Sequence, residues 1–260
     1  MDYTNLFRLD GRKAVAVGSA SGIGRESALA LAAHGAHVVC ADRNLDGAEE
    51  TSRLIREQGG TAEALQLDVL DSAQVFDAAA EHNDADTLLF TAATNVRKPL
   101  LDYSSDEYDR VVALNQRSSF DLIRAFGANM VGRQGGSIIG FSSIRHVVVE
   151  PGQGVYAASK AATVQLLRTA AAEFGHAGVR ANAIAPGCVD TPLTDAIKAT
   201  PEWYDAYASK SALGRWSKPS ELAGAVVYLA SDASTFVTGS VLYVDGGWTA
   251  VDGRFAPPMS

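Results

Sequence analysis

Short apolar runs alternate with longer amphipathic segments along almost the whole chain. The runs lack the polar alternation of half-exposed strands, and they lie at 14–17, 38–41, 64–67, 87–90, 137–141, 180–184 and 241–244. Such runs are typical of strands covered on both faces. The amphipathic segments are expected helices at 25–34, 45–58, 72–82, 105–130, 155–176 and 219–231. This alternation predicts an α/β fold, a doubly wound parallel sheet of about seven strands with helices on both faces.

Composition narrows the class of protein. The 260 residues contain no repeat or linker, so we expect one domain over 1–260. A net charge of -8 disfavours nucleic acid and anionic membranes as partners. The partner we expect is a small-molecule substrate, which the motifs below indicate. No apolar run is long enough to cross a bilayer, and residues 1–10 show no signal core. Two cysteines imply no disulfide framework, so we expect a cytoplasmic protein. We expect no metal site.

A glycine-rich loop directly follows the first expected strand. Its sequence is Gly18-Ser-Ala-Ser21-Gly22-Ile23-Gly24, and a helix comes next. Glycines let phosphates approach backbone N–H groups, and the helix N-terminus adds partial positive charge there. The spacing differs from the usual GxGxxG, and a turn that binds nothing is the alternative. The loop predicts a site for the pyrophosphate of a dinucleotide.

Asp42 ends the second expected strand, 18 residues after Gly24. A carboxylate there accepts hydrogen bonds from the adenosine ribose hydroxyls and repels the 2′-phosphate of NADP. The alternative is an ordinary aspartate that caps the next turn. Arg43 follows at once and would receive a 2′-phosphate. Because the glycine-rich loop has no basic residue, we expect NAD rather than NADP.

Tyr156 and Lys160 are four residues apart and share one face of an expected helix. A nearby ammonium stabilises the phenolate, so Tyr156 is a candidate acid/base for an alcohol proton. Ser143 follows the fifth apolar run, where its hydroxyl can stabilise the substrate oxygen. Asn115 lies within a long expected helix, and it could hold a water beside Lys160. The alternative for Tyr156 and Lys160 is an ordinary pair on the protein surface. The alternative for Ser143 is a serine that hydrogen-bonds the backbone, and that for Asn115 is an asparagine tolerated at a helix irregularity.

Together and in this order, these motifs resemble the short-chain dehydrogenase/reductase family from about Lys13 to Gly247. The run Leu67-Asp68-Val69 and the segment from Asn182 to Thr191 continue the resemblance. It implies a Rossmann domain that binds NAD(P) and moves hydride between nicotinamide and a secondary alcohol or ketone.

The resemblance also assigns roles. It makes Tyr156 the general acid/base, has Lys160 bind the nicotinamide ribose, and gives Asn115 a proton relay through water. The residues expected along the cofactor are Gly18, Ser21, Gly22, Ile23, Gly24, Asp42, Arg43, Asp68, Val69, Ala92, Tyr156, Lys160, Pro186, Gly187, Val189 and Thr191. It further implies a homotetramer joined partly by the long helices, and a mobile substrate lid at about 191–216.

Two departures from the family pattern stand out. Val17 replaces the family threonine before the first glycine, and Phe90-Thr91-Ala92-Ala93 replaces Asn-Asn-Ala-Gly. We expect a somewhat altered loop in which Thr91 supplies part of the lost hydrogen bonding. The enzyme should remain active, because the catalytic residues are retained.

The substrate is less constrained. The candidate substrate residues on nearby loops are Arg97, Arg145, His146, Gln153 and Trp203, with Glu150 beside them. A cation there would favour a carboxylate, phosphate or sulfonate; the alternative is a solvated charge. Glu150, Gln153 and Trp203 could instead bind and stack on a sugar. The runs 97–100 and 246–250 are similar to family members acting on sugar acids and polyols, including gluconate 5-dehydrogenases.

The leading hypothesis is therefore an NAD-dependent oxidoreductase acting on a sugar, sugar acid or polyol. The alternatives are an NADPH-dependent ketoreductase of the 3-oxoacyl thioester type and a non-catalytic dinucleotide-binding regulator. The tail, 249–260, is either extended towards another subunit or disordered.

Overall fold

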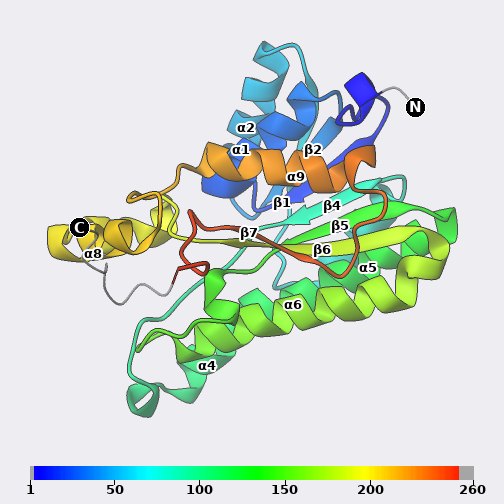
Figure 1. Ribbon diagram of the computed structural model, residues 1–260. Helices are drawn as coiled ribbons and strands as arrows, with labels where there is room; N and C mark the ends of the chain where they lie inside the picture. Colours follow the sequence, from blue (N-terminus) through cyan, green and yellow to red (C-terminus); the bar gives the residue numbers. More distant parts are fainter. Residues whose placement is uncertain (1–2, 252–260) are drawn as a thin grey trace.

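A parallel sheet of seven strands lies between two layers of helices (Figure 1). The computed structural model describes residues 3–251. The strands are β1 (Lys13–Val17), β2 (His37–Asp42), β3 (Thr61–Gln66), β4 (Thr87–Phe90), β5 (Gly136–Phe141), β6 (Val179–Pro186) and β7 (Val241–Val244). Their order in the sheet is β3-β2-β1-β4-β5-β6-β7. The predicted fold class, a single doubly wound α/β domain, is confirmed.

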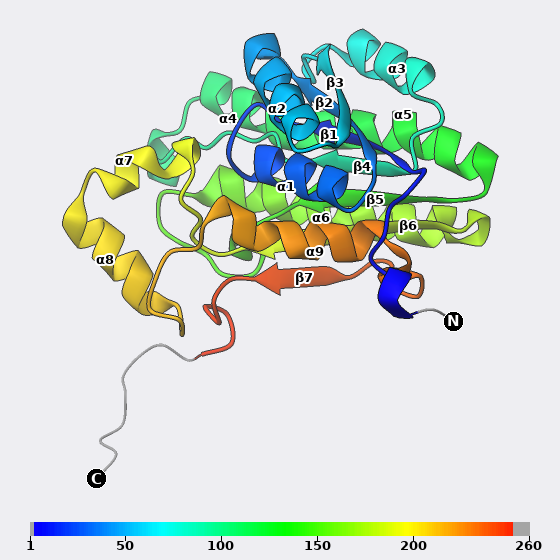
Figure 2. The ribbon, with the colours of Figure 1, turned by 90° about the horizontal axis from the view of Figure 1, so that it is seen from above.

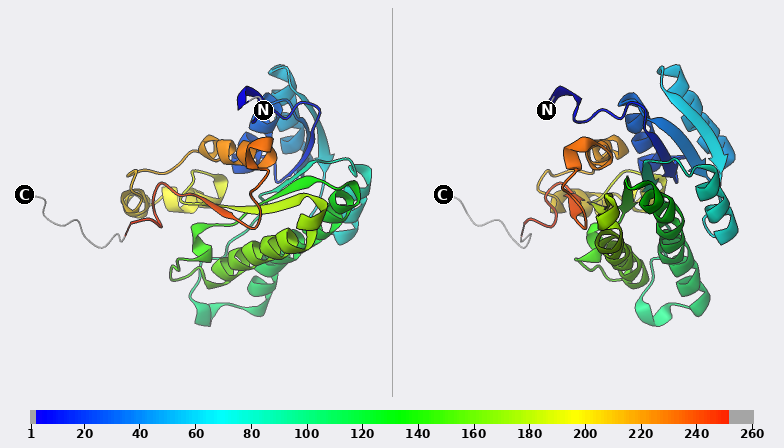
Figure 3. Two further views of the ribbon diagram at one scale, coloured as in Figure 1. Left: turned by 45° about the vertical axis from the view of Figure 1, so that its right-hand side comes forward. Right: turned by 90° about the vertical axis from the view of Figure 1, so that its right-hand side faces the viewer.

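Each face of the sheet has its own helices and its own core. On one face lie α1 (Gly22–Ala33), α2 (Leu45–Glu57) and α9 (Ala223–Ala230). On the other lie α3 (Ser72–Glu81), α4 (Ser105–Val112), α5 (Ser118–Arg133) and α6 (Gly154–Phe174). Figure 3 shows α5 and α6 running side by side beneath the sheet. Both faces of the central strands are thus buried, which explains why they read as continuous apolar runs.

The expected elements differ from the observed ones mainly at the sheet edge. Two strands, 87–90 and 241–244, have the predicted bounds. The third strand begins at Thr61 rather than at residue 64, because β3 is an edge strand with exposed residues at its start. The long helix expected at 105–130 contains a π-helical turn, Ala113–Arg117, and continues to Arg133.

Local signals place two helix ends. Asn44 caps α2, since its side chain accepts a hydrogen bond from the Gly47 N–H at 3.2 Å. After α1, Gly35 adopts φ +105° and donates its N–H to the Ala32 carbonyl at 2.9 Å. These caps hold the connections short, so that the strands end together.

The carboxyl ends of the strands open towards one end of the molecule. Beyond them lie two short helices, α7 (Asp195–Lys198) and α8 (Pro201–Lys210), as Figure 2 shows. This is where ligands bind in open parallel sheets. No helix within residues 3–251 is both long and apolar enough to span a lipid bilayer. Most of the predicted tail, 252–260, lies outside the described residues.

Candidate active site

The glycine-rich loop is shaped by close backbone contacts. Gly18 has φ +88° and Gly22 has φ +55°, which only glycine adopts without strain. A Cβ atom at Gly24 would lie 1.9 Å from the Gly18 carbonyl oxygen, and one at Gly18 would lie 2.4 Å from the Thr91 hydroxyl. Side chains are therefore excluded at Gly18 and Gly24, and the backbone there stays open to a ligand at the N-terminus of α1.

Thr91 ties the altered loop after β4 to β1. Its hydroxyl lies 3.2 Å from the carbonyl oxygens of both Val17 and Gly18, and its N–H donates to Val17 at 3.0 Å. The hydroxyl thus supplies bonding that the family asparagines would otherwise give, as expected from the sequence. The replacement of the Asn-Asn-Ala-Gly pattern leaves the strand ends joined.

Asp42 bonds to the loop and to its own turn. One carboxylate oxygen accepts from the Ala20 N–H at 3.0 Å and the other from the Asn44 N–H at 2.9 Å. The turn-capping alternative is thus part of its role. Asp42 is nevertheless half-buried and faces the cleft, beside the exposed Arg43.

All sixteen expected cofactor residues line one cleft of about 470 Å³ at the carboxyl ends of the strands. Its volume is in the range of cofactor sites. The cleft runs from the Asp42 end, past the glycine-rich loop, to Ser143, Tyr156 and Lys160. Backbone amides, an acidic strand end and a polar catalytic end are the features that a nicotinamide dinucleotide requires, so these residues fit the expected cofactor.

Ser143, Tyr156 and Lys160 gather at the inner end of this cleft. Burial raises the pKa of Tyr156, against the lowering effects of a hydrogen bond with Ser143 and of the charges of Arg145 and Arg97. Burial also lowers the pKa of Lys160 to about 8. Its ammonium donates to the Phe141 carbonyl at 2.8 Å and lies 5.8 Å from the centre of the Tyr156 ring. The two arginines thus favour the phenolate form of Tyr156, an effect that the sequence led us to expect from Lys160.

Asn115 lies behind the cleft, in the π-helical turn, and is 1% exposed. Its side chain accepts from the Thr94 N–H at 2.8 Å and donates to the Thr94 carbonyl at 2.9 Å and the Ser159 hydroxyl at 3.0 Å. The helix irregularity that the sequence left open is therefore present. Asn115 joins the loop after β4 to α6, which carries Tyr156.

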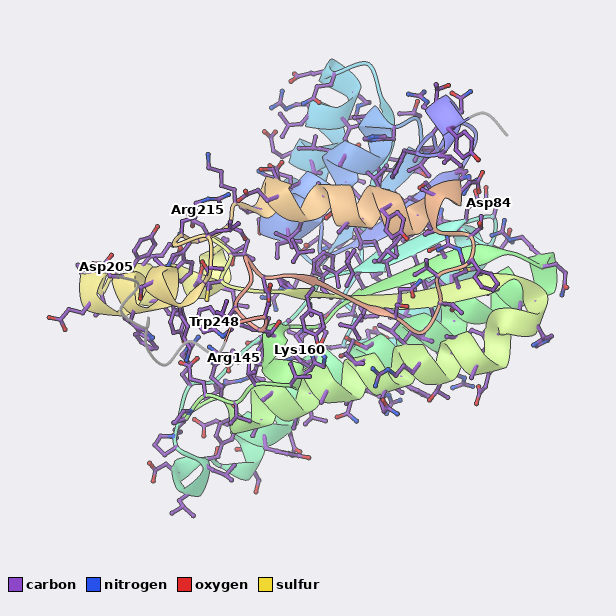
Figure 4. The ribbon with its side chains drawn as sticks, viewed as in Figure 1. Asp84, Arg145, Lys160, Asp205, Arg215 and Trp248 are labelled. Carbon is purple, nitrogen blue, oxygen red and sulfur yellow. The ribbon has the colours of Figure 1, made fainter. Side chains whose placement is uncertain are left out.

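A smaller cavity of about 80 Å³ adjoins the catalytic end and shares Ser143 and Tyr156 with the cleft. Three expected substrate residues, Arg97, Arg145 and Gln153, line it. Arg145 lies beside Trp248 (Figure 4), with its guanidinium carbon 5.5 Å from the centre of the indole ring.

Two expected substrate residues lie outside this cavity. His146 donates from Nδ1 to the Ser143 carbonyl at 2.6 Å, and its Nε2 lies 3.1 Å from the Tyr243 hydroxyl. Trp203, on α8, stacks under the Arg97 guanidinium at 5.1 Å. His146 therefore contacts the backbone of Ser143, and Trp203 contacts Arg97, so each packs against a residue that lines the cavity.

Sequence reasoning missed Asn95, Tyr207 and Trp216, which also line the cavity. Asn95 lies in the loop after β4, and this position at the carboxyl end of a strand was a signal that could have identified it as a site residue. Tyr207 and Trp216 belong to the segment expected to be a substrate lid, 191–216, but no motif singled them out, and only the fold brings them to the cavity that Ser143 lines.

Comparisons with known proteins agree with this geometry. Residues 17–249 match the family model described as Enoyl-(Acyl carrier protein) reductase. Galactitol 2-dehydrogenase (L-tagatose-forming) of Cereibacter sphaeroides is 38% identical over 96% of this chain and 99% of that protein. Gluconate 5-dehydrogenase of Gluconobacter oxydans is 33% identical over 96% and 99%. The structure of a gluconate 5-dehydrogenase from Burkholderia cenocepacia, in complex with NADP and tartrate, is similar with a TM-score of 0.92 at 35% identity, over 95% of this chain and 98% of that one.

Proposed function

This chain belongs to the short-chain dehydrogenase/reductase family, and on that premise we propose that it oxidises a secondary hydroxyl of a sugar, sugar acid or polyol with NAD. The observation that carries the proposal is the gathering of Ser143, Tyr156 and Lys160 at one end of a cleft whose other end presents Asp42. Curated relatives named for galactitol and gluconate support the class of substrate.

The residues present suffice for the proton part of the reaction. A nicotinamide cofactor held by the residues of the cleft would supply the acceptor for the hydride of the carbinol carbon. Tyr156 takes the hydroxyl proton as the carbonyl forms, and Ser143 donates a hydrogen bond to the same oxygen. Ser143, Arg145 and Arg97 lower the pKa of Tyr156 and so favour its charged form, and the Lys160 ammonium lies 5.8 Å from the centre of the Tyr156 ring.

The preference for NAD rests on Asp42. Its carboxylate lines the cleft where the adenosine ribose of a dinucleotide would lie, and it would repel a 2′-phosphate. Arg43 is the opposing feature, and solved relatives hold NADP. The carboxylate is anchored by two N–H groups, whereas Arg43 is exposed at the rim, so we weigh Asp42 more heavily.

The test is reduction of NAD and of NADP by a panel of sugars, sugar acids and polyols, followed by the absorbance of the reduced nicotinamide. We expect turnover with NAD, and a loss of at least about a thousandfold in kcat for Tyr156→Phe with cofactor affinity unchanged. Unaltered turnover in that variant would exclude the mechanism. Asp42→Asn keeps the side-chain shape and should raise the NADP/NAD ratio of kcat/KM about tenfold. An unchanged ratio would assign the preference to another residue.

We also propose a cytoplasmic homotetramer in which α5 and α6 form one interface. An exposed apolar groove between these helices, lined by Phe120, Ile123, Val131, Leu166 and Phe174, supports this, as do two free cysteines for the reducing compartment. Sedimentation should show four copies, and Phe120→Glu should reduce the number. A monomeric wild-type enzyme would contradict it.

A further inference from the structure

Glu150 joins four side chains that line the substrate cavity. Its carboxylate accepts from Arg97 at 3.2 Å and from Gln153 at 2.8 Å, and it also pairs with Arg145 and the Tyr207 hydroxyl. These donors come from the loop after β4, the start of α6, the turn after β5, and α8. One carboxylate therefore connects four of the side chains that line the cavity together with Ser143 and Tyr156.

Arg97, Arg145 and Glu150 together carry a net positive charge. Arg145 is 8% exposed and the Arg97 side chain 30% exposed, so neither cation is freely solvated. Within residues 3–251, Glu150 is the carboxylate with which both form ion pairs. Two guanidinium groups and one carboxylate leave one positive charge beside the cavity. Burying that charge has a cost, which a bound anion would offset.

The cavity also contains an acceptor without a donor. The Oδ1 atom of Asn95 is buried and has no hydrogen-bond partner, although its Nδ2 donates to Gln153 at 3.1 Å. A buried acceptor left unpaired is unfavourable, and a ligand hydroxyl would satisfy it. A carboxylate could not, because it has no proton to donate.

We propose that the substrate is a monoanionic hydroxy acid, with its carboxylate bound by Arg97 and Arg145 and with one of its hydroxyls donating a hydrogen bond to Asn95 Oδ1. Glu150 is a positioning residue that holds both guanidinium groups towards the cavity. This assignment rests on the proposed function and narrows its substrate to the acidic members of that class. The reacting carbinol would lie at Ser143 and Tyr156, which line both cavities.

A matched substrate pair tests the proposal. Galactitol and galactonate have the same carbon chain, but galactonate carries a carboxylate in place of one terminal CH₂OH. We expect kcat/KM to be at least about tenfold higher for galactonate, as one unscreened charge predicts. Equal values or a preference for galactitol would overturn the inference and leave the proposed function standing. The inactivity of both, and of every other alcohol in the panel, would instead remove the proposed function.

Two variants separate charge recognition from a structural role. Arg97→Gln and Glu150→Gln break the same ion pair but change the charge of the pocket in opposite directions. We expect the galactonate/galactitol ratio of kcat/KM to fall about tenfold in the first variant and to rise in the second. If these residues had only a structural role, the galactonate/galactitol ratio would change in the same direction in both variants or in neither. That result would overturn the proposal.

The ratio is insensitive to other effects of these substitutions. Both substrates react at the same Tyr156, so a changed phenolate affects them equally, and a partly inactive preparation leaves the ratio unchanged. Arg53→Gln is the control, because Arg53 pairs with Glu50 and Glu57 on α2, away from the site. It removes one positive charge and should leave the ratio at its wild-type value.

Discussion

The large cleft and the smaller cavity that adjoins it are built by different means. We call the glycine-rich part of the cleft the cofactor end, and the smaller cavity the substrate end. The cofactor end is shaped by backbone, since Gly18 and Gly24 leave no room for a Cβ atom. The substrate end is shaped by side chains, with Glu150 holding residues from four separate segments. A backbone site suits a ligand shared by many enzymes, whereas a side-chain site can change without altering the fold.

This difference predicts unequal tolerance to substitution. At the cofactor end one added methyl group meets backbone, which cannot move without shifting two strands. At the substrate end Glu150 has four hydrogen-bonding partners, so the loss of one of them leaves the others in place. The following variants test this, from the largest expected effect to the smallest.

Gly24→Ala should have the largest effect. Its Cβ would lie 1.9 Å from the Gly18 carbonyl oxygen, so the loop must shift. We expect a loss of roughly 3 kcal/mol in the free energy of unfolding and at least tenfold weaker NAD binding, measured by denaturation and calorimetry. Gly224→Ala is the matched control, since nothing lies within 4 Å of its Cβ in α9. It should stabilise by about 0.5–1 kcal/mol. Similar results for both would refute the role of close packing.

Lys160→Met should strongly reduce turnover while stabilising the free enzyme. Burial lowers the Lys160 pKa from 10.5 to about 8, which corresponds to about 3 kcal/mol, and the lost bond to the Phe141 carbonyl returns about 1 kcal/mol. We therefore expect a gain of about 2 kcal/mol at neutral pH and a kcat lower by at least about a hundredfold. A destabilised variant would contradict the burial argument.

The lowered pKa of Lys160 also determines how the stability gain of Lys160→Met depends on pH. Between pH 8 and 10.5 the folded lysine is neutral while the unfolded one stays protonated, so wild-type stability rises with pH in this window. The advantage of Lys160→Met should shrink over that range and be constant below it. Chemical denaturation of both proteins at several pH values gives the comparison.

Tyr207→Phe should have the smallest effect. The variant loses two hydrogen bonds, one that Tyr207 donates to Glu150 and one that it accepts from Arg97 at 3.3 Å, while Glu150 keeps its bonds to Arg97, Arg145 and Gln153. We expect the substrate KM to rise no more than about thirtyfold, since each hydrogen bond is worth about 1 kcal/mol. The affinity for NAD should not change, with Tyr228→Phe on α9 as the control. Weaker NAD binding in Tyr207→Phe alone would show that the two ends are coupled.

Most of the cofactor end could be predicted from the sequence. The apolar runs located every strand of the sheet, and the residues that follow them line one cleft. Less of the substrate end could be predicted. Gln153, Arg97 and Arg145 were found from their nearness to motifs, but His146 was placed with them and instead contacts Tyr243.

The sequence by itself determined the sheet, the glycine-rich loop and the order of the catalytic residues, because each depends on neighbours within a few residues or on a local apolar pattern. Only the tertiary structure decided what surrounds the substrate. Asn95, Glu150, Tyr207 and Trp248 are far apart in the chain, and their hydrogen bonds and ring contacts exist only when the strand ends and α8 come together. The charge left by Arg97 and Arg145 is a property of that assembly, since neither residue shows its partner in the sequence.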